Sequence, residues 1–161
     1  MIFQHTWQDV MSGRKTQTRR IVKAGESSAA RFNIAATATN RVVLSASGRI
    51  KWYTGGTYAV QPGRGKKAIG RIRITGIRKE RLQEISEKDA LAEGIDVTHG
   101  IFKRDGTPDI DPAPTFALLW NEVHGAGAWG ANPEVWVLEF ELEPAETHSE
   151  EDIASRLDLV P

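Results

Sequence analysis

The sequence predicts an α+β domain, built as a small, partly closed mixed β-barrel with two or three short flanking helices. Two observations support this fold class. Short segments of alternating apolar and polar residues recur along the chain with Gly- and Pro-containing turns between them, and segments with helical spacing are few and short. The length of 161 residues is typical of one domain.

The first element expected is a short helix from Phe3 to Gly13, because apolar residues repeat there at spacings of three and four. Thr6 is the expected N-cap, with Asp9 completing a capping box. Gly13 suits the helix end, where a left-handed conformation is common. A basic stretch, GRKTQTRR, starts at this glycine.

Strands are expected wherever the alternation is regular, and the segment Lys23 to Asn40, which has little pattern, is expected to be a long loop. The predicted strands are 18–22, the pair 41–45 and 49–53 joined around Ala46-Ser47-Gly48, then 57–61, 68–77 and 134–143. In 68–77 the run R-I-R-I-T predicts a half-buried strand with an arginine face.

Two further helices are expected in the second half. One starts at the capping sequence Ser86-Glu87-Lys88-Asp89 and ends at Gly94, and the other covers Thr115 to Val123. The segment from Asp96 to Pro114 is expected to be a loop. Residues 144–161 are acidic, so we expect a single domain over 1–143 followed by an acidic C-terminal tail.

The composition excludes several classes of protein. The chain has no cysteine, which excludes disulfides, thiolate metal sites and a cysteine nucleophile. The four histidines have no metal-ligand spacing, so neither a metal site nor a cofactor is expected. No apolar run approaches about 18 residues, and the start lacks the apolar core of a signal peptide. We therefore expect a cytoplasmic protein without a membrane partner.

Charge is distributed unevenly, although the net charge is zero. Residues 1–81 contain 17 Lys and Arg against 3 Asp and Glu, whereas residues 82–161 contain 4 against 18. Two interpretations remain open. The two halves neutralise each other in the folded domain, or one face is basic and binds phosphates while the acids lie elsewhere.

Several segments in order resemble one family, the ASCH proteins, which are relatives of the PUA RNA-binding domain. These segments are G-R-K-T-Q-T-R-R at 13–20, Y-A-V-Q-P-G-R-G-K at 58–66, L-Q-E-I-S-E-K-D-A-L-A-E-G-I at 82–95, F-x-x-L-W at 116–120 and W-G-A-N-P-E-V-W-V-L-E-F at 129–140. Among ASCH proteins, the chain resembles phage and prophage members. The resemblance implies a PUA-like barrel with a cleft near the basic stretch.

The resemblance also implies a function and a site. ASCH proteins are thought to bind RNA, and some small members are amidohydrolases that remove the acetyl group of 4-acetylcytidine with a Lys, a Thr and a Glu. Matched by motif, these are Lys15, Thr18 and Glu93. Three hypotheses follow: binding of RNA or a modified nucleoside, hydrolysis of an amide on such a nucleoside, and a non-catalytic phage accessory role. Ribonuclease activity, also proposed for members, is less favoured.

Other candidates for contacts to substrate or nucleic acid are cationic or aromatic. They are Arg14, Arg19, Arg20, Arg64, Lys66, Lys67, Tyr58, Trp129 and Asn132. The cations suit phosphate contacts and the aromatic residues suit stacking on a base, although Arg19 and Arg20 also suit ion pairs with acids. Trp120 and Trp136 are expected in the core.

The catalytic hypothesis makes demands on Lys15 and on the path of the chain. A lysine pKa of about 10.4 must fall before the amine acts as a base at neutral pH, and burial or neighbouring arginines lower it. On a straight strand, residues i and i+3 point to opposite faces. The hypothesis therefore predicts that 13–18 is curved and that the strand starts at Thr18 or later.

Overall fold

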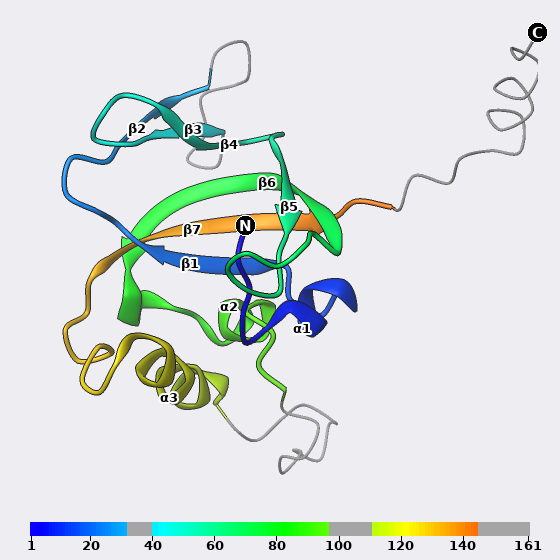
Figure 1. Ribbon diagram of the computed structural model, residues 1–161. Coiled ribbons are helices and arrows are strands. Elements are labelled where there is room, and N and C mark those ends of the chain that lie inside the picture. Colours follow the sequence, from blue (N-terminus) through cyan, green and yellow to red (C-terminus); the bar gives the residue numbers. More distant parts are fainter. Residues whose placement is uncertain (32–39, 97–110, 145–161) are drawn as a thin grey trace, which may run out of the picture.

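The computed structural model describes residues 1–31, 40–96 and 111–144, which form two antiparallel sheets and several short helices (Figure 1). The larger sheet has the strand order β1-β7-β6-β5. Its strands are β1 (Gln17–Ile21), β5 (Thr57–Val60), β6 (Gly70–Arg81) and β7 (Glu134–Leu142). The smaller sheet has the order β2-β3-β4, with β2 (Ser27–Ala30), β3 (Arg41–Leu44) and β4 (Ile50–Tyr53).

The long pair β6 and β7 forms the centre of the larger sheet, and both strands curl across the molecule in Figure 1. Their register runs from Ile72 opposite Leu142 to Arg81 opposite Glu134, with a shift between Ile74 and Gly76. Strand pairs in the described chain are antiparallel, and a parallel contact is made by an isolated bridge between Ile2 and Gln61. The predicted fold class, α+β with a partly closed sheet, is confirmed.

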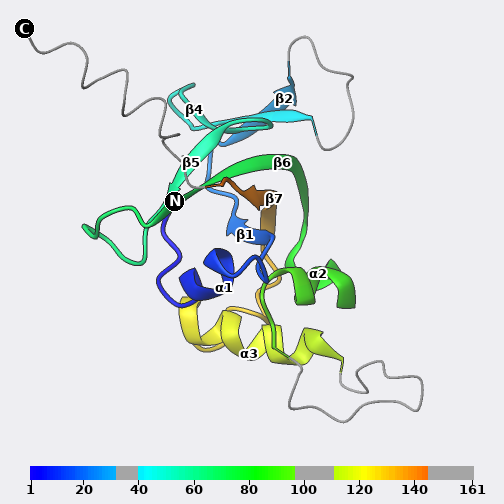
Figure 2. The same ribbon diagram turned by 90° about the vertical axis from the view of Figure 1, so that its right-hand side faces the viewer.

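The smaller sheet covers one side of the larger sheet, and the helices lie on the other side (Figure 2). Val43 and Trp52 of the smaller sheet are buried against Ile74, Ile77 and Trp136. The indole Nε1 of Trp136 donates to Glu26 at 2.9 Å, and Lys51 also donates to Glu26, at 2.5 Å. These contacts tie the two sheets together.

Strand β2 corrects the prediction that 23–40 is a loop without regular structure. Its sequence, Ser-Ser-Ala-Ala, has low strand propensity, but the backbone pairs with β3 from Ser27 opposite Leu44 to Ala30 opposite Arg41. Pairing with a neighbour, which is not a local property of the sequence, therefore decides its conformation. Residues 32–39 of the predicted loop lie outside the described residues.

The helices are α1 (Trp7–Met11), α2 (Glu87–Ala92) and α3 (Pro112–His124), with a 3₁₀ turn at Leu82–Glu84. The predicted start of the first helix is wrong, because Phe3 lies in an extended segment whose N–H donates to the carbonyl of Gln61. The predicted capping box is also wrong: the Thr6 side chain makes no capping hydrogen bond. Instead, the carboxylate of Asp9 pairs with Arg14.

Helices α2 and α3 begin with caps. Ser86 accepts a hydrogen bond from Asp89 N at 3.1 Å, as predicted from the sequence. Helix α3 starts three residues earlier than expected, because Asp111 accepts from Ala113 N and Pro112 occupies the first turn, where proline is tolerated. Most of the predicted loop 96–114 and the tail from residue 145 onward lie outside the described residues.

Apolar side chains from both sides of the larger sheet form the core. Trp120 and Trp136 are buried, as predicted. On the helix side, Phe116 and Trp120 pack with Val135 and Val137. Where the N-terminal segment crosses the sheet, Phe3 and Val10 pack with Phe140. In the described part of the chain, no helix has the length and hydrophobicity needed to cross a membrane.

Candidate functional site

A cavity of about 390 Å³ opens beside β1, which is an edge strand of the larger sheet. It lies between the N-terminal segment and helix α3. Its lining comprises residues 2–6, Lys15, Thr18, Arg19, Arg20, Arg64, Glu93, Phe116, Leu119, Trp120, Val123 and His124. The structure therefore brings Lys15, Thr18 and Glu93 to one cavity, together with three of the predicted arginines.

Lys15 and Glu93 form a buried ion pair at the floor of this cavity. The Lys15 Nζ atom donates to Glu93 Oε2 at 2.5 Å and to the Glu93 carbonyl at 2.8 Å, and both side chains are 4% exposed. Burial lowers the pKa of Lys15 by more than the nearby Glu93 carboxylate raises it. An ammonium group has three protons, so one remains for a group in the cavity when Lys15 is charged.

Gly94 allows Glu93 to reach Lys15. Helix α2 ends at Ala92 with Glu93 as its C-cap, and Gly94 follows with φ +92°, a conformation that favours glycine. A Cβ atom at Gly94 would lie 3.2 Å from Lys15 Cβ and 3.1 Å from Asp9 Cβ. The close approach of the helix end to the start of β1 thus depends on the missing side chain.

The residues just before β1 run along the ends of helices α1 and α2 before the chain enters the larger sheet. Gly13 has φ +76°, as predicted for a helix end. Lys15 N donates to Asp9 O and Thr16 N donates to Ala92 O. Strand β1 starts at Gln17, one residue earlier than predicted, but Lys15 lies before it, and the side chains of Lys15 and Thr18 both border the cavity.

Thr18 is buried, and its hydroxyl makes no hydrogen bond with the other described residues. A hydroxyl carries one donor and two acceptor positions, so this group is available to a ligand or a water molecule in the cavity.

Arg19 is held by acids. Its side chain is 0% exposed and pairs with Glu93 Oε1 at 3.1 Å, Glu80 at 2.5 Å and Asp89 at 3.4 Å. It also donates to Gln17 Oε1 at 2.7 Å. Of the two roles that the sequence left open for this arginine, the structure shows the pairing with acids.

Arg20, the next residue, has no acid partner among the described residues. Its Nη2 donates to the carbonyl of Ile2 at 2.8 Å, and its guanidinium lies 5.5 Å from the centre of the Phe3 ring. Its buried Nε atom has no hydrogen-bond partner. Burial lowers the pKa of Arg20, so this cation is incompletely stabilised by the protein.

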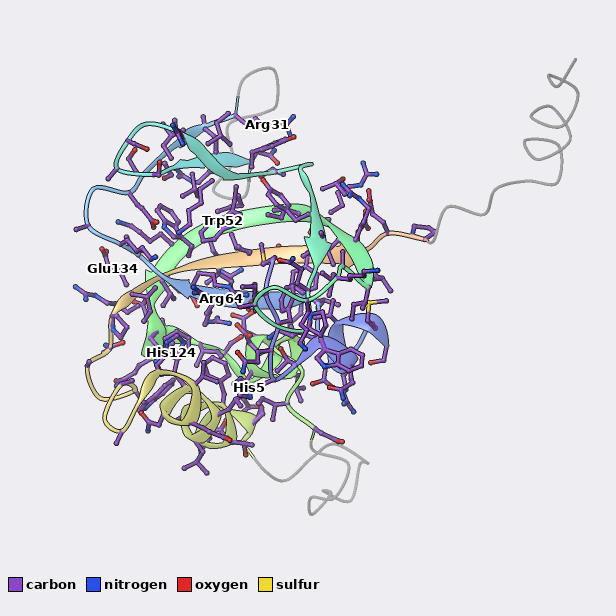
Figure 3. All side chains as sticks on the ribbon, in the orientation of Figure 1. His5, Arg31, Trp52, Arg64, His124 and Glu134 are labelled. Carbon is purple, nitrogen blue, oxygen red and sulfur yellow. The ribbon has the colours of Figure 1, made fainter. Side chains whose placement is uncertain are left out.

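The exposed part of the lining, which we call the mouth of the cavity, comprises Gln4, His5, Arg64, Val123 and His124. Figure 3 labels His5, Arg64 and His124. His124 lies against the buried Trp120, with 4.1 Å between ring centres. Partial burial of the imidazole and the charge of Arg20 lower the pKa of His124. The sequence did not point to either histidine, because His5 and His124 meet only through the fold. In the part of the chain with described coordinates, no cluster of acids and histidines is arranged to hold a metal ion.

The remaining predicted contact residues do not line this cavity. Arg14 is exposed and pairs with Asp9 and Asp96. Lys66 and Lys67 are exposed on the loop between β5 and β6.

The predicted aromatic and amide contacts have structural partners. The hydroxyl of Tyr58 accepts from Tyr53 N, and Trp129 packs edge-on against Phe116 with ring centres 6.2 Å apart. Asn132 has φ +44°, and its side chain accepts from Gln83 N at 2.9 Å.

The uneven charge of the sequence has a structural explanation. Ion pairs join cations of the first half to acids of the second half, as in Lys15–Glu93, Arg19–Asp89, Arg73–Glu143, Arg78–Glu139 and Lys79–Glu134. Within the described chain, other cations of the first half have no ion pair, among them Arg20, Arg49, Arg64, Lys66 and Lys67. Mutual neutralisation and an unpaired basic set therefore coexist.

Comparisons with known proteins support the fold. No family model and no curated protein match the sequence. The chain is similar to the crystal structure of a protein from Enterococcus faecalis V583 in the family DUF984, with a TM-score of 0.52 and 18% identity, over 91% of this chain and 74% of that one. An ASCH domain from Lactobacillus crispatus JV V101 gives a TM-score of 0.49 and 16% identity, over 84% and 69%. The first likeness shows a shared fold.

Proposed function

We propose that this chain is an ASCH-type protein and that its cavity binds a modified nucleoside. One observation carries the proposal: Lys15, Thr18 and Glu93, which lie far apart in the sequence, line a single cavity. These are the three residues that the motif resemblance selects.

The cavity suits one nucleoside better than a length of RNA. Its volume of about 390 Å³ falls in the range of about 300–1,000 Å³ that is usual for small-molecule pockets. Phe116 and Trp120 supply aromatic surface against which a base can pack, and Lys15, Thr18 and Glu93 supply the polar groups that fix its orientation.

Hydrolysis of an exocyclic amide on that nucleoside is the second candidate, and the environment of Lys15 favours it. Because burial lowers the Lys15 pKa, a larger fraction of this amine is neutral than for an exposed lysine. The unpartnered Thr18 hydroxyl provides either the nucleophile or the group that holds an attacking water.

The reaction then balances in two steps. The Lys15 amine takes the proton of the attacking hydroxyl while its oxygen forms a bond to the acyl carbon. The resulting tetrahedral species breaks its C–N bond, and the Lys15 ammonium returns the proton to the leaving amine. With water the products are acetate and cytidine. With Thr18 as nucleophile, a second attack by water releases the acetyl group. Glu93, which accepts from Nζ, keeps Lys15 directed to the cavity.

The test uses cytidine for binding and 4-acetylcytidine for turnover. We expect both nucleosides to bind by isothermal titration calorimetry, and acetate to be released by the wild-type protein. Lys15→Met and Thr18→Val are expected to reduce turnover at least 100-fold, because they remove the base and the hydroxyl with little change in volume. Lys88→Met, an exposed lysine on α2, is the matched control. Absence of binding to either nucleoside contradicts the proposal, whereas binding without turnover contradicts the hydrolysis alone.

Binding to RNA is favoured by a different observation, the exposed cations Arg49, Arg64, Lys66 and Lys67, which form no ion pair within the described chain. Phosphate contacts of this kind make affinity fall steeply with salt. A filter-binding titration of single-stranded RNA at rising salt tests it, and an affinity that is independent of salt argues against it.

A further inference from the structure

We propose that the mouth of the cavity is a phosphate subsite, so that the ligand is a nucleotide carrying a phosphomonoester and not the free nucleoside. This subsite consists of Arg20, Arg64, His5, His124 and the indole N–H of Trp120. The inference rests on the proposed function, because it assumes that the base lies at the floor beside Lys15 and Thr18.

Two of the four cationic side chains that line the cavity have no ion pair within the described chain. Lys15 pairs with Glu93, and Arg19 pairs with Glu93 and also with Glu80 and Asp89, which lie outside the lining, whereas Arg20 and Arg64 have no such partner. The two oxygens of Glu93 are already engaged, Oε2 by Lys15 and Oε1 by Arg19. Arg20 and Arg64 are thus left without an acid among the described residues.

Three buried donors of residues that line the cavity lack a hydrogen-bond partner among the described residues. They are the Nε atoms of Arg19 and Arg20 and the Nε1 atom of Trp120. Buried donors that stay unpaired reduce stability, and such groups in a native protein are often completed by a ligand. A phosphate has several acceptor oxygens, and arginine pairs with it through two parallel hydrogen bonds.

The gradient of exposure sets the orientation of the ligand. Lys15, Thr18 and Glu93 are buried, whereas His5, Arg64 and His124 are exposed. A phosphate is strongly hydrated, so it is better placed at the mouth, where it keeps part of its water, while the base enters the drier floor. His5, Arg64 and His124, labelled in Figure 3, come from separate parts of the chain: the N-terminal segment, the β5–β6 loop and the end of α3.

The experiment compares cytidine 5′-monophosphate with cytidine by calorimetry. For the wild-type protein we expect the nucleotide to bind at least tenfold more tightly. Arg64→Gln removes one exposed cation at the mouth and should reduce this ratio to threefold or less. Arg49→Gln, which removes an exposed cation from the β3–β4 turn outside the cavity lining, should leave the ratio unchanged.

A second readout reports on the subsite directly. The imidazole of His124 lies near Arg20, with His5 and Arg64 lining the same cavity, so a bound phosphate should raise the pKa of His124, as followed by NMR. Cytidine should leave that pKa nearly unchanged. Inorganic phosphate should compete with the nucleotide, and a 5′-phosphorylated trinucleotide that binds as tightly as the mononucleotide would place the phosphate at the end of an RNA.

Two outcomes separate this inference from the function on which it rests. If cytidine and its monophosphate bind equally well, the phosphate subsite is wrong and the nucleoside site stands. If Arg49→Gln reduces the ratio as much as Arg64→Gln, the preference comes from overall charge, and the assignment to the cavity mouth is wrong.

Discussion

Two neighbouring arginines on strand β1, Arg19 and Arg20, have different surroundings. Arg19, on the face toward the helices, is 0% exposed and is surrounded by Glu80, Asp89 and Glu93. Arg20 lies over Phe3 and has a single carbonyl acceptor among the described residues. Both side chains line the cavity, but the Arg19 guanidinium pairs with three carboxylates, although its Nε atom has no hydrogen-bond partner, whereas Arg20 has no acid partner among the described residues. The difference separates a structural cation from one that is available to a ligand.

The largest effect on stability is expected from removing the Arg19 side chain, which pairs with three carboxylates. Arg19→Met should lower the free energy of unfolding by about 3–5 kcal/mol, because removing one partner leaves buried carboxylates without their counter-charge. Chemical denaturation followed by circular dichroism measures it. Arg73→Met is the matched control, since Arg73 pairs with Glu143 on the exposed face of β6, and surface pairs contribute about 0–1 kcal/mol. Equal losses for the two variants would show that burial is not what distinguishes the Arg19 network.

Gly94→Ala tests whether the close approach of the α2 end to the start of β1 positions Glu93 beside Lys15 and Arg19. The new methyl group meets the Cβ atoms of Asp9 and Lys15, and the alanine must keep the positive φ of the glycine. We therefore expect the free energy of unfolding to fall by about 2 kcal/mol and cytidine to bind more weakly. Gly127→Ala shares the positive φ but meets no atom within 4 Å. It should lose about 1 kcal/mol from backbone strain alone and retain the nucleoside affinity. A cytidine affinity that is the same in both variants would contradict the role given to Gly94.

The protonation of Lys15 links stability to pH. Its folded pKa is below the ordinary value of 10.5, so between the two values the unfolded chain binds more protons than the native protein. Stability should therefore rise with pH in this window, by at most about 1.4 kcal/mol per pH unit, and Lys15→Met should lack this contribution. Turnover should rise with pH through the same folded pKa. The difference in unfolding free energy between the two proteins, measured from pH 6 to 10, checks the sign, and a falling difference would contradict it.

How far the sequence anticipated this arrangement depends on whether the cause is local. The R-I-R-I-T run predicted the buried Ile72 and Ile74 and the exposed Arg71, and Ser86 predicted the cap of α2, because side-chain periodicity and capping are set by nearby residues. Strand β2 and the acid partners of Arg19 depend on contacts with distant segments, which no local pattern reveals.

The candidate site shows the same limit. A motif resemblance selected Lys15, Thr18 and Glu93, which line one cavity, but the distinction between Arg19 and Arg20 was left open. The predicted strand 18–22 already places adjacent residues on opposite faces of a sheet. Which acids or aromatic rings lie beside each of them depends on distant segments, namely Glu80, Asp89 and Glu93 for Arg19 and Phe3 for Arg20. His5 and His124 carried no signal at all, since each is an isolated histidine in the sequence.

The smallest effect on stability is expected from removing the Arg20 side chain, which has no acid partner among the described residues. Arg20→Met removes a partly buried cation whose pKa burial lowers, and it removes one hydrogen bond, to Ile2 O. Relief of the desolvation cost and loss of that bond oppose each other, so the unfolding free energy should change by less than about 1 kcal/mol. The preference for cytidine monophosphate over cytidine should fall at least tenfold in the same variant. A stability loss as large as that of Arg19→Met, with the nucleotide preference intact, would mean that both arginines are structural and that the two faces of β1 do not differ in function.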